Sequence, residues 1–278
     1  MIVAIFPHPT HPDATKLAKQ IVDFFHAHKV KVVAEPPYTD ALSVDPLSSV
    51  KEVEFLISMG GDGTILRLAH KYRHLKAAIL GINLGHLGFM ADVPTSDLLP
   101  SLRDFLEGAY TIENRLMIEG KAPNGQTFYA INDFVMHRAH NPSLIELSIY
   151  LDDLYLNTFE ADGIILATPN GSTAYSLAAG GPILSPGLDG FVITPICPHT
   201  ISNRPIVLTT TQELRIEYQS HYPKIEVIAD GLDTIHITPR QSFSFKKSNK
   251  TFRLVTLKRR DYYSTLRTKL GWSGKLRH

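Results

Sequence analysis

The sequence contains a single cysteine, Cys197. An internal disulfide bond and a cysteine metal cluster each need at least two thiols, so both are excluded within one chain. Because Ile196 and Pro198 flank this cysteine, we expect Cys197 to be a small buried apolar residue.

Long apolar segments are also missing. No uninterrupted apolar run approaches the roughly 18 residues that a membrane-spanning helix requires. The apolar residues 1–6 stop at Pro7 and have no basic flank, so they predict a first strand rather than a signal peptide. We therefore expect a cytoplasmic protein without a membrane partner.

Neither sign of charge dominates, since 28 Lys and Arg residues face 27 Asp and Glu residues and the formal net charge is +1. Proteins that bind nucleic acids carry basic surfaces, so this balance predicts no nucleic-acid partner. Hydrophobic residues make up 44% and charged residues 20%, which is ordinary for a globular protein. An anionic ligand would have to be recognised by a few residues at one site.

Two familiar nucleotide-binding signatures are absent. The sequence has no Gly-x4-Gly-Lys-Ser/Thr, which excludes a P-loop enzyme. The first strand runs into Pro7-His8-Pro9 and lacks Gly-x-Gly-x-x-Gly, so it gives no support for dinucleotide binding in the Rossmann mode. Any phosphate must be held by a different loop.

In the first third of the chain, short apolar runs alternate with helical patterns. This alternation predicts a parallel sheet covered by helices. The expected strands are residues 1–6, 30–33, 55–59 and 77–82, and the expected helices are one capped by Asp13, residues 65–72 and residues 96–107.

From about Thr111 the pattern changes to alternation with period two. Such short strands in succession predict an antiparallel sandwich or barrel, and the strands are residues 144–151, 214–218, 224–229 and 234–238. Residues 261–270 are helical again. We expect an α/β domain over residues 1–110, a β-rich, β-sandwich-like domain over residues 111–255, and a C-terminal segment, residues 256–278, whose helix packs back on the first domain.

The loop Gly60-Gly61-Asp62-Gly63-Thr64 follows a strand and opens a helix. Glycines at this junction let the backbone approach a phosphate, and the helix N-terminus supplies free N–H groups. A carboxylate is unexpected in a loop that only binds anions. Asp62 suits a general base for a hydroxyl, a ribose-binding group or a partner of the metal that accompanies a triphosphate. The alternative is a tight turn in which Asp62 caps the helix.

A second polar segment follows the short apolar strand that begins after Asp162-Gly163. The hydroxyls of Ser172, Thr173 and Ser176 and the aromatic face of Tyr175 suit a base and a ribose held against the backbone. A glycine-rich connection between two strands would have a similar composition, so this alternative stays open.

Taken together, these residues resemble the bacterial NAD kinase family. The glycine–aspartate loop alone also occurs in diacylglycerol kinases, sphingosine-type lipid kinases and phosphofructokinases, so the combination carries the resemblance. The shared marks extend from Met59 to Trp272, and they are the Gly-Gly-Asp-Gly-Thr loop, Asn132-Asp133, Asp162-Gly163, Gly171 to Ser176, Pro198-His199-Thr200, Asn203-Arg204-Pro205 and Leu270-Gly271-Trp272.

The resemblance implies a reaction and its partners. A phosphoryl group would pass from ATP or polyphosphate to the 2′-hydroxyl of the adenosine ribose of NAD, giving NADP. A divalent metal ion, Mg²⁺ before others, would take part, and the β-rich domain would bind NAD. Family members are usually homodimers or homotetramers in which the partner subunit often completes the site.

The resemblance also implies roles for individual residues. Asp62 would accept the proton, with Gly63 and Arg67 near the dinucleotide. Asn132 and Asp133 would hold a ribose and base, and Asp162 would lie by the nicotinamide. The shared pocket would be lined by Thr173, Ala174, Tyr175, Ser176, Leu177 and Ala178, and the donor phosphates would face Gly60, Gly61, Gly63 and Thr64.

Three positions depart from the family pattern. Asp133 stands where many relatives carry Glu, and we expect the shorter side chain to keep the ribose contact but to shift it. Glu160 stands where many have a basic residue, so an anion contact there is in doubt. Leu232 follows Asp230-Gly231 where Gln is common, so a hydrogen bond from that position is lost.

Two other functions fit the same residues. One is a kinase of this loop type that acts on a lipid or a sugar; a lipid kinase would present an amphipathic basic helix, and none is found in the sequence. The other is a non-catalytic sensor of NAD(H) or NADP(H). A sensor would be favoured by loss of the loop carboxylate, but Asp62 is present.

Overall fold

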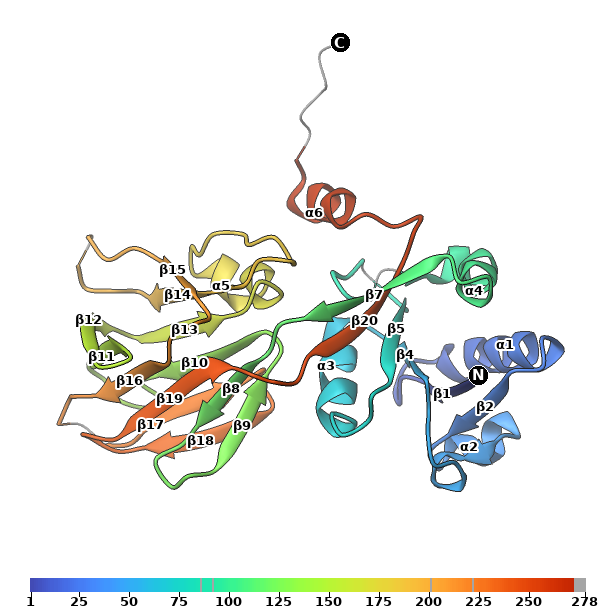
Figure 1. Cartoon of the computed structure of the whole chain (residues 1–278), viewed down its shortest axis with the longest axis horizontal. Helices are drawn as coiled ribbons and strands as arrows, with labels where there is room; N and C mark the ends of the chain where they lie inside the picture. Colours follow the sequence, from blue (N-terminus) through green and yellow to red (C-terminus); the bar gives the residue numbers. More distant parts are fainter. Residues whose placement is uncertain (86, 92, 201, 222, 273–278) are drawn as a thin grey trace, which may run out of the picture. The chain divides into compact units, whose positions relative to one another are not determined.

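The computed structural model describes residues 1–85, 87–91, 93–200, 202–221 and 223–272 (Figure 1). The chain forms two compact units. Unit 1 contains Met1–Asn114 and the chain from Phe252 onward, and unit 2 contains Arg115–Thr251. Unit 1 is therefore assembled from two separate stretches of sequence, whereas unit 2 is continuous.

Unit 1 is built on one sheet with the strand order β3-β2-β1-β4-β5-β20-β7, with β6 beside β5. The pairs β1–β2, β1–β4, β4–β5 and β5–β20 are parallel. Strands β4 and β5 are buried along their whole length, as expected for parallel strands covered on both faces. The strands are β1 (Ile2–Phe6), β2 (Lys31–Ala34), β3 (Asp45–Pro46), β4 (Phe55–Met59), β5 (Ala78–Asn83), β6 (Val93–Pro94), β7 (Tyr110–Arg115) and β20 (Phe252–Leu257).

Helices cover this sheet. The helix α1 buries residues at helical spacing, and its Phe25 ring lies 6.1 Å from that of Phe105, which in turn lies 4.8 Å from Phe55. Asp13 occupies the predicted N-cap position of α1, but its side chain makes no capping hydrogen bond. The predicted position is therefore confirmed and the predicted side-chain cap is wrong. The helices are α1 (Ala14–Ala27), α2 (Tyr38–Leu42), α3 (Asp62–Lys71), α4 (Leu98–Leu106) and α6 (Tyr262–Leu270), with 3₁₀ turns η1 (Leu47–Ser49) and η2 (Thr95–Asp97).

Unit 2 consists of two antiparallel sheets that share one core. The first has the order β15-β14-β13-β10-β17-β18 and the second β12-β11-β16-β19-β8-β9. Phe134 of the first sheet lies 5.9 Å from Phe243 and 5.1 Å from Phe245 of the second, measured between ring centres. The strands are β8 (Ile118–Lys121), β9 (Thr127–Ala130), β10 (Asp133–His137), β11 (Ile145–Leu151), β12 (Leu154–Ala161), β13 (Gly163–Ala167), β14 (Gly190–Ile196), β15 (Ile206–Thr209), β16 (Leu214–Tyr218), β17 (Ile225–Ala229), β18 (Asp233–Ile237) and β19 (Ser242–Lys247).

The helix α6 belongs to unit 1 and contacts its N-terminal stretch. Asp261 caps it by accepting hydrogen bonds from the N–H groups of Tyr263 and Ser264, at 3.1 and 3.0 Å. The Lys269 ammonium donates a 2.7 Å hydrogen bond to the Leu87 carbonyl, which lies in the loop after β5. The predicted fold class is confirmed. It consists of a parallel-sheet α/β domain and an antiparallel sandwich-like domain, with a C-terminal helix that packs on the first domain. None of the described helices has the length and apolar character needed to span a membrane.

Cys197 corrects one expectation, because the residue is exposed rather than buried. The strand β14 ends one residue earlier, at Ile196. Cys197 then adopts a left-handed backbone conformation with φ of 45°, so it begins a surface loop instead of continuing the buried strand. The apolar neighbours in the sequence therefore misled the prediction.

Candidate active site

The glycine-rich loop joins β4 to α3 in unit 1. Gly60 has φ of 156°, and a Cβ atom there would lie 2.5 Å from the Thr64 hydroxyl oxygen, so the turn requires glycine. At Gly61 and Gly63, by contrast, an added Cβ would have no atom within 4 Å. Since neither residue needs to be glycine for the fold, both leave open space above the helix N-terminus, where first-turn N–H groups lack intrahelical acceptors.

The Asp62 carboxylate is fixed by the loop that follows β5. Its Oδ2 atom accepts a 2.8 Å hydrogen bond from the N–H of Phe89, and its Oδ1 atom accepts bonds of 3.0 and 2.9 Å from Met90 and Ala91. A Cβ atom on Gly88 would lie 2.1 Å from Oδ1, so only glycine lets the loop come this close. A carboxylate offers about four acceptor positions, and one on Oδ2 remains for a further donor.

The N-cap of α3 is Gly61, not Asp62, so the structure excludes the capping alternative. The side chain of Asp62 instead turns toward residues 89–91. Arg67 lies one helical turn after Gly63 and is exposed, with its Nη2 atom 3.5 Å from the Thr64 hydroxyl. The predicted residues Gly60 to Thr64 and Arg67 are therefore gathered at one end of α3.

Unit 2 contains a cavity of about 560 Å³. This volume is within the range of small-molecule sites, about 300–1,000 Å³. Five residues singled out from the sequence line it, namely Asn132, Asp133, Asp162, Ala174 and Tyr175. Sequence reasoning assigned no ligand contact to the other lining residues, Val135, His137, Arg138, Ala139, Ile196, Ile228, Asp230 and Gly231.

Asp230 holds the backbone that presents the predicted Asn132-Asp133 pair. Its carboxylate accepts hydrogen bonds from the N–H groups of Ile131, Asn132 and Asp133, at 2.7, 2.8 and 3.0 Å. In return, the N–H of Asp230 donates a 2.9 Å bond to the Asp133 carbonyl. The connection between β17 and β18 therefore fixes the start of β10.

The loop after β13 holds Asn132 from another direction. The Asn170 amide donates a 2.6 Å hydrogen bond to the Asn132 side-chain oxygen, and the N–H of Thr168 donates a 2.9 Å bond to the Asn132 carbonyl. A Cβ atom on Gly171 would lie 2.1 Å from that carbonyl oxygen, so the close approach requires glycine. Asn132 is thus held by both its side chain and its backbone.

Asp133 is buried, and burial raises the pKa of its carboxyl to about 7, with the charge of Asp230 as a second cause. Near neutral pH this carboxyl is therefore partly protonated. A protonated carboxyl can donate as well as accept a hydrogen bond, which a ribose hydroxyl or a base nitrogen can use.

Asp162 forms an ion pair with Arg138 in the cavity wall. The Arg138 Nε atom lies 2.7 Å from the Asp162 Oδ1 atom, and the N–H of Arg138 donates a 3.0 Å bond to the Asp162 carbonyl. Both side chains are about one-third exposed, at 35% and 33%. A polar group entering the cavity meets this fixed pair of charges.

The segment predicted to line the pocket divides into two groups. Ala174 and Tyr175, at the start of α5 (Tyr175–Ala178), line the cavity, and the Tyr175 side chain is exposed. Thr173, Ser176, Leu177 and Ala178 are not part of the lining. Thr173 donates to the Asn170 carbonyl at 3.2 Å, and the buried Ser176 hydroxyl lies 2.9 Å from that of Thr194. Their predicted ligand contacts stay predictions.

Two of the positions that depart from the family pattern, Glu160 and Leu232, lie outside this cavity. Glu160 lines a neighbouring cavity of about 830 Å³ that shares Arg138 and Asp162 with the first. Its carboxylate is 3.7 Å from the His199 ring. Leu232 is exposed in the connection after β17.

Comparison with known proteins decides between the kinase classes. Residues 3–110 match the family model for the ATP-NAD kinase N-terminal domain, and residues 131–257 match that for the ATP-NAD kinase C-terminal domain. The chain is 49% identical over 278 residues to the NAD kinase of Protochlamydia amoebophila, covering 99% of this chain and 100% of the relative. The chain belongs to the NAD kinase family. It is therefore a phosphotransferase, and the lipid and sugar kinases of the same loop type are set aside.

Further relatives agree. The chain is 34% identical over 279 residues to the NAD kinase of Syntrophotalea carbinolica, covering 97% of this chain and 98% of the relative. The crystal structure of yeast NADH kinase complexed with NADH superposes with a TM-score of 0.87 at 25% identity, covering 100% of this chain and 89% of that one. An NAD kinase from Archaeoglobus fulgidus in complex with ATP has a TM-score of 0.78 at 24% identity, covering 99% and 100%, and so shares the fold.

Proposed function

We propose that this member of the NAD kinase family transfers the terminal phosphoryl group of ATP, or of another donor, to the 2′-hydroxyl of the adenosine ribose of NAD, with Asp62 as general base. The observation that carries the proposal is the fixed Asp62 carboxylate. Three backbone N–H groups orient it and leave one acceptor position on Oδ2, beside two glycines that leave open space. A substrate hydroxyl can donate its proton there.

The cavity of unit 2 is proposed to bind the dinucleotide. Asn132 and Asp133 are held by Asp230 and by the loop after β13, so they can recognise a ribose and a base without rearranging. The exposed ring of Tyr175 offers a face for a base, and Asp162 meets the nicotinamide end. We propose that the same segment also supplies contacts to the dinucleotide from Thr173, Ser176, Leu177 and Ala178.

The donor phosphates are proposed to lie over Gly60, Gly61, Gly63 and Thr64. The first-turn N–H groups of α3 and the positive end of its dipole attract the phosphate oxygens, and Arg67 on the same helix is proposed to lie near the dinucleotide. As the new O–P bond forms at the ribose, the bond to the donor's leaving oxygen breaks and ADP departs with the electron pair. In this scheme the chain's residues orient the groups and neutralise charge.

A divalent ion, Mg²⁺ before others, is proposed to enter with the triphosphate and to neutralise its charge. Within the described ranges of the chain, no three His, Cys, Asp or Glu side chains form a group that could hold a metal ion. The residues that the structure describes therefore do not form a metal-binding cage of their own. Phosphate oxygens and water commonly supply most Mg²⁺ ligands in phosphoryl-transfer enzymes, which is consistent with such a site.

The test is a coupled assay with purified protein, NAD, ATP and Mg²⁺, in which an NADP-specific dehydrogenase reports the product. We expect NADP to accumulate, and we expect turnover of Asp62→Asn to fall by about 100-fold or more because a positioned base contributes this much. NAD binding, measured by calorimetry, should be largely retained. Unchanged turnover in Asp62→Asn would remove the residue from the mechanism.

A matched control separates the chemistry of Asp62 from its hold on the loop. Asn cannot accept all three backbone hydrogen bonds, so the melting temperature of Asp62→Asn is measured beside its activity. Asp23 is an exposed aspartate on α1, and Asp23→Asn should keep both activity and melting temperature. Tight NAD binding without NADP from any donor would instead support a non-catalytic sensor.

The assembly and location of the protein are proposals that rest on the family resemblance. We propose a cytoplasmic homodimer or homotetramer, with NAD and a nucleoside triphosphate as its small-molecule partners. Light scattering coupled to size-exclusion chromatography would distinguish these assemblies, and a mass of one chain would contradict both.

A further inference from the structure

The loop that fixes Asp62, residues 87–91, is also held by the C-terminal helix. The Lys269 ammonium on α6 donates a 2.7 Å hydrogen bond to the Leu87 carbonyl and lies 5.1 Å from the centre of the Phe89 ring. The Phe89 ring is in turn 5.9 Å from that of Tyr262, at the start of α6. The loop therefore has two sets of contacts. Its backbone N–H groups bind the Asp62 carboxylate, and its Leu87 carbonyl and Phe89 side chain contact α6.

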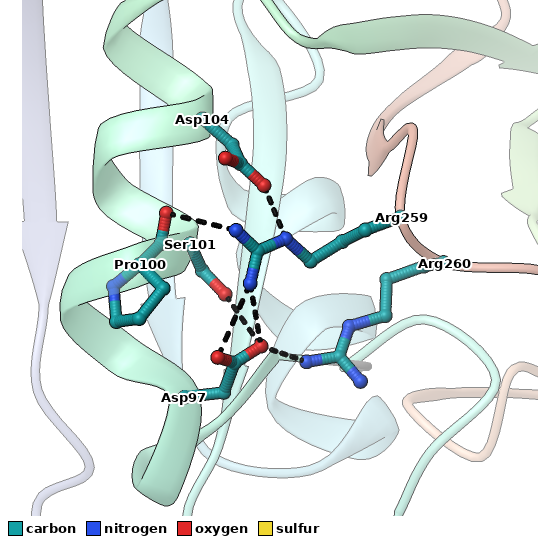
Figure 2. Close-up of polar contacts among 6 residues, drawn as sticks. All are labelled: Asp97, Pro100, Ser101, Asp104, Arg259 and Arg260. Carbon is teal, nitrogen blue, oxygen red and sulfur yellow. Dashed lines mark hydrogen bonds and ion pairs between the residues drawn. The ribbon is translucent and has the colours of Figure 1, made fainter.

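The start of α6 is itself anchored, as Figure 2 shows. Arg259 donates from Nε to the Asp104 carboxylate and from Nη1 to both Asp97 oxygens at 3.2 Å. The neighbouring Arg260 donates from Nη2 to Asp97 at 2.6 Å, and Arg259 also reaches the Pro100 carbonyl at 3.5 Å. Both arginines lie between β20 and α6, while their acceptors lie on η2 and α4. These contacts fix the point from which α6 leaves the sheet.

We propose that α6, anchored by Arg259 and Arg260, is a positioning element that holds residues 87–91 against the Asp62 carboxylate, with Lys269 and Phe89 as the contacts that transmit its position. The inference rests on the proposed role of Asp62 as general base. Lys269 and Phe89 are positioning residues, because they act on Asp62 only through the loop backbone.

The geometry makes the coupling strict. The loop N–H groups of Phe89, Met90 and Ala91 determine where both Asp62 oxygens lie. A Cβ atom on Gly88 would lie 2.1 Å from Oδ1, so the loop backbone packs directly against the carboxylate, and we expect a shift of the loop to shift the carboxylate. A displacement of about 1 Å in a catalytic group can cost on the order of 100-fold in rate. Loosening the outer side of the loop should therefore reduce turnover without removing any group that touches substrate.

The test is Lys269→Met, which keeps a flexible apolar side chain but removes the ammonium. We expect kcat to fall by about three- to tenfold, with KM for NAD and for ATP within about twofold. Hydrogen exchange at the amides of residues 89–91 should accelerate. Lys269→Arg, which restores a cation and a donor, should recover most of the turnover.

Two further variants make the result specific. Lys19→Met changes an exposed lysine on α1 in the same unit and should alter neither kcat nor exchange. Arg259→Gln removes the contacts with Asp97 and Asp104 and should change kcat and the exchange at residues 89–91 in the same direction as Lys269→Met. The kcat and exchange rates of Lys269→Met, Lys19→Met and Arg259→Gln are compared at a temperature at which the melting curve of each variant shows the folded state.

Each other outcome overturns the inference. If Lys269→Met keeps wild-type kcat while Asp62→Asn is inactive, Asp62 remains the base but α6 does not position it. A rise in KM with unchanged kcat would place the effect in substrate binding, and an equal loss in Lys19→Met would make it nonspecific. If Asp62→Asn retains full turnover, the proposed role of Asp62 fails and the inference fails with it.

Discussion

Folding changes the protonation state of Asp133 near neutral pH. Burial, followed by the charge of Asp230, raises the pKa of its carboxyl to about 7, whereas an aspartate in an unfolded chain has a pKa of about 3.9. Between these values the folded protein binds more protons at this position than the unfolded chain does. The contribution of Asp133 to stability is therefore full below about pH 4 and is lost as the pH rises to about 7.

Replacement of Asp133 by Asn tests this dependence, because Asn has nearly the same shape and stays neutral. The quantity to measure is the difference in free energy of unfolding, wild type minus Asp133→Asn. This difference should fall between pH 5 and pH 7. Since one unit of pKa shift corresponds to about 1.4 kcal/mol, the fall should be a few kcal/mol at most. Above about pH 8 the difference should be constant. Urea unfolding at several pH values measures it, and parallel curves for the two proteins would contradict the raised pKa.

Residues that carry local signals were predictable from the sequence. The five residues from Gly60 to Thr64 follow a buried strand, and the structure places them at the start of a helix, as the glycine spacing indicated. Asp230 and Arg138 were given no role, because each acts through a partner far along the chain. Asp230 meets residues 131–133 about 97 to 99 positions earlier, and no short-range pattern reports such a contact.

At the scale of elements, the loop of residues 87–91 and the helix α3 are fitted to each other around Asp62. Gly88 is the tightest point, because a Cβ atom there would lie 2.1 Å from the Asp62 Oδ1 atom. Gly85 lies three positions before Gly88. A Cβ atom on Gly85 would have no atom within 4 Å, and its φ is not positive. The two glycines therefore form a matched pair.

The substitution Gly88→Ala should force the loop away from Asp62. We expect kcat to fall by about 100-fold and the free energy of unfolding to fall by about 1–3 kcal/mol, the usual cost of an overpacked site. Gly85→Ala should leave both quantities within experimental error. Steady-state kinetics and urea unfolding provide the measurements. Full activity in Gly88→Ala would show that the loop can move without displacing the carboxylate.

Helices and strands with a clear hydrophobic period were predicted correctly from the sequence, whereas the predicted positions of their ends were less accurate. The strand over residues 55–59 matches β4, and the final helix differs from α6 only by its cap, Asp261. The helix α3 begins three residues before the expected position, because the turn at Gly60 and Gly61 lets Asp62 enter the helix. Neither β7 nor β20 was predicted from the sequence, because their strand character depends on pairing within a sheet formed by distant segments.

At the scale of the whole molecule, β20 completes the sheet of unit 1 from the far end of the chain. It lies between β5 and β7, and its side chains Phe252, Leu254, Val255 and Leu257 are all buried. Burial of a large apolar side chain contributes about 1.5–3 kcal/mol, so these four together contribute an amount comparable to the stability of a domain, about 5–15 kcal/mol. Unit 1 should depend on this strand for folding.

Two truncations test that dependence. A chain that ends at Thr251 should lose the folded sheet of unit 1 but keep the two sheets of unit 2, because residues 115–251 contain all of their strands. A chain that ends at Arg260 keeps β20 and should retain both units, with reduced turnover because α6 is missing. Hydrogen exchange resolved by peptide measures each unit. Protection of β1 and β4 in the shorter chain would contradict the prediction.

The origin of unit 1 in two stretches of sequence also sets an order of events during synthesis. Unit 2 has all its strands once residue 251 has left the ribosome, and domains generally fold as units while the chain is made. The sheet that carries Asp62 must wait for β20, and the loop of residues 87–91 gains its outer support only when α6 follows. A chain that stops before Phe252 can therefore display the complete cavity of unit 2 while the sheet that carries Asp62 still lacks β20.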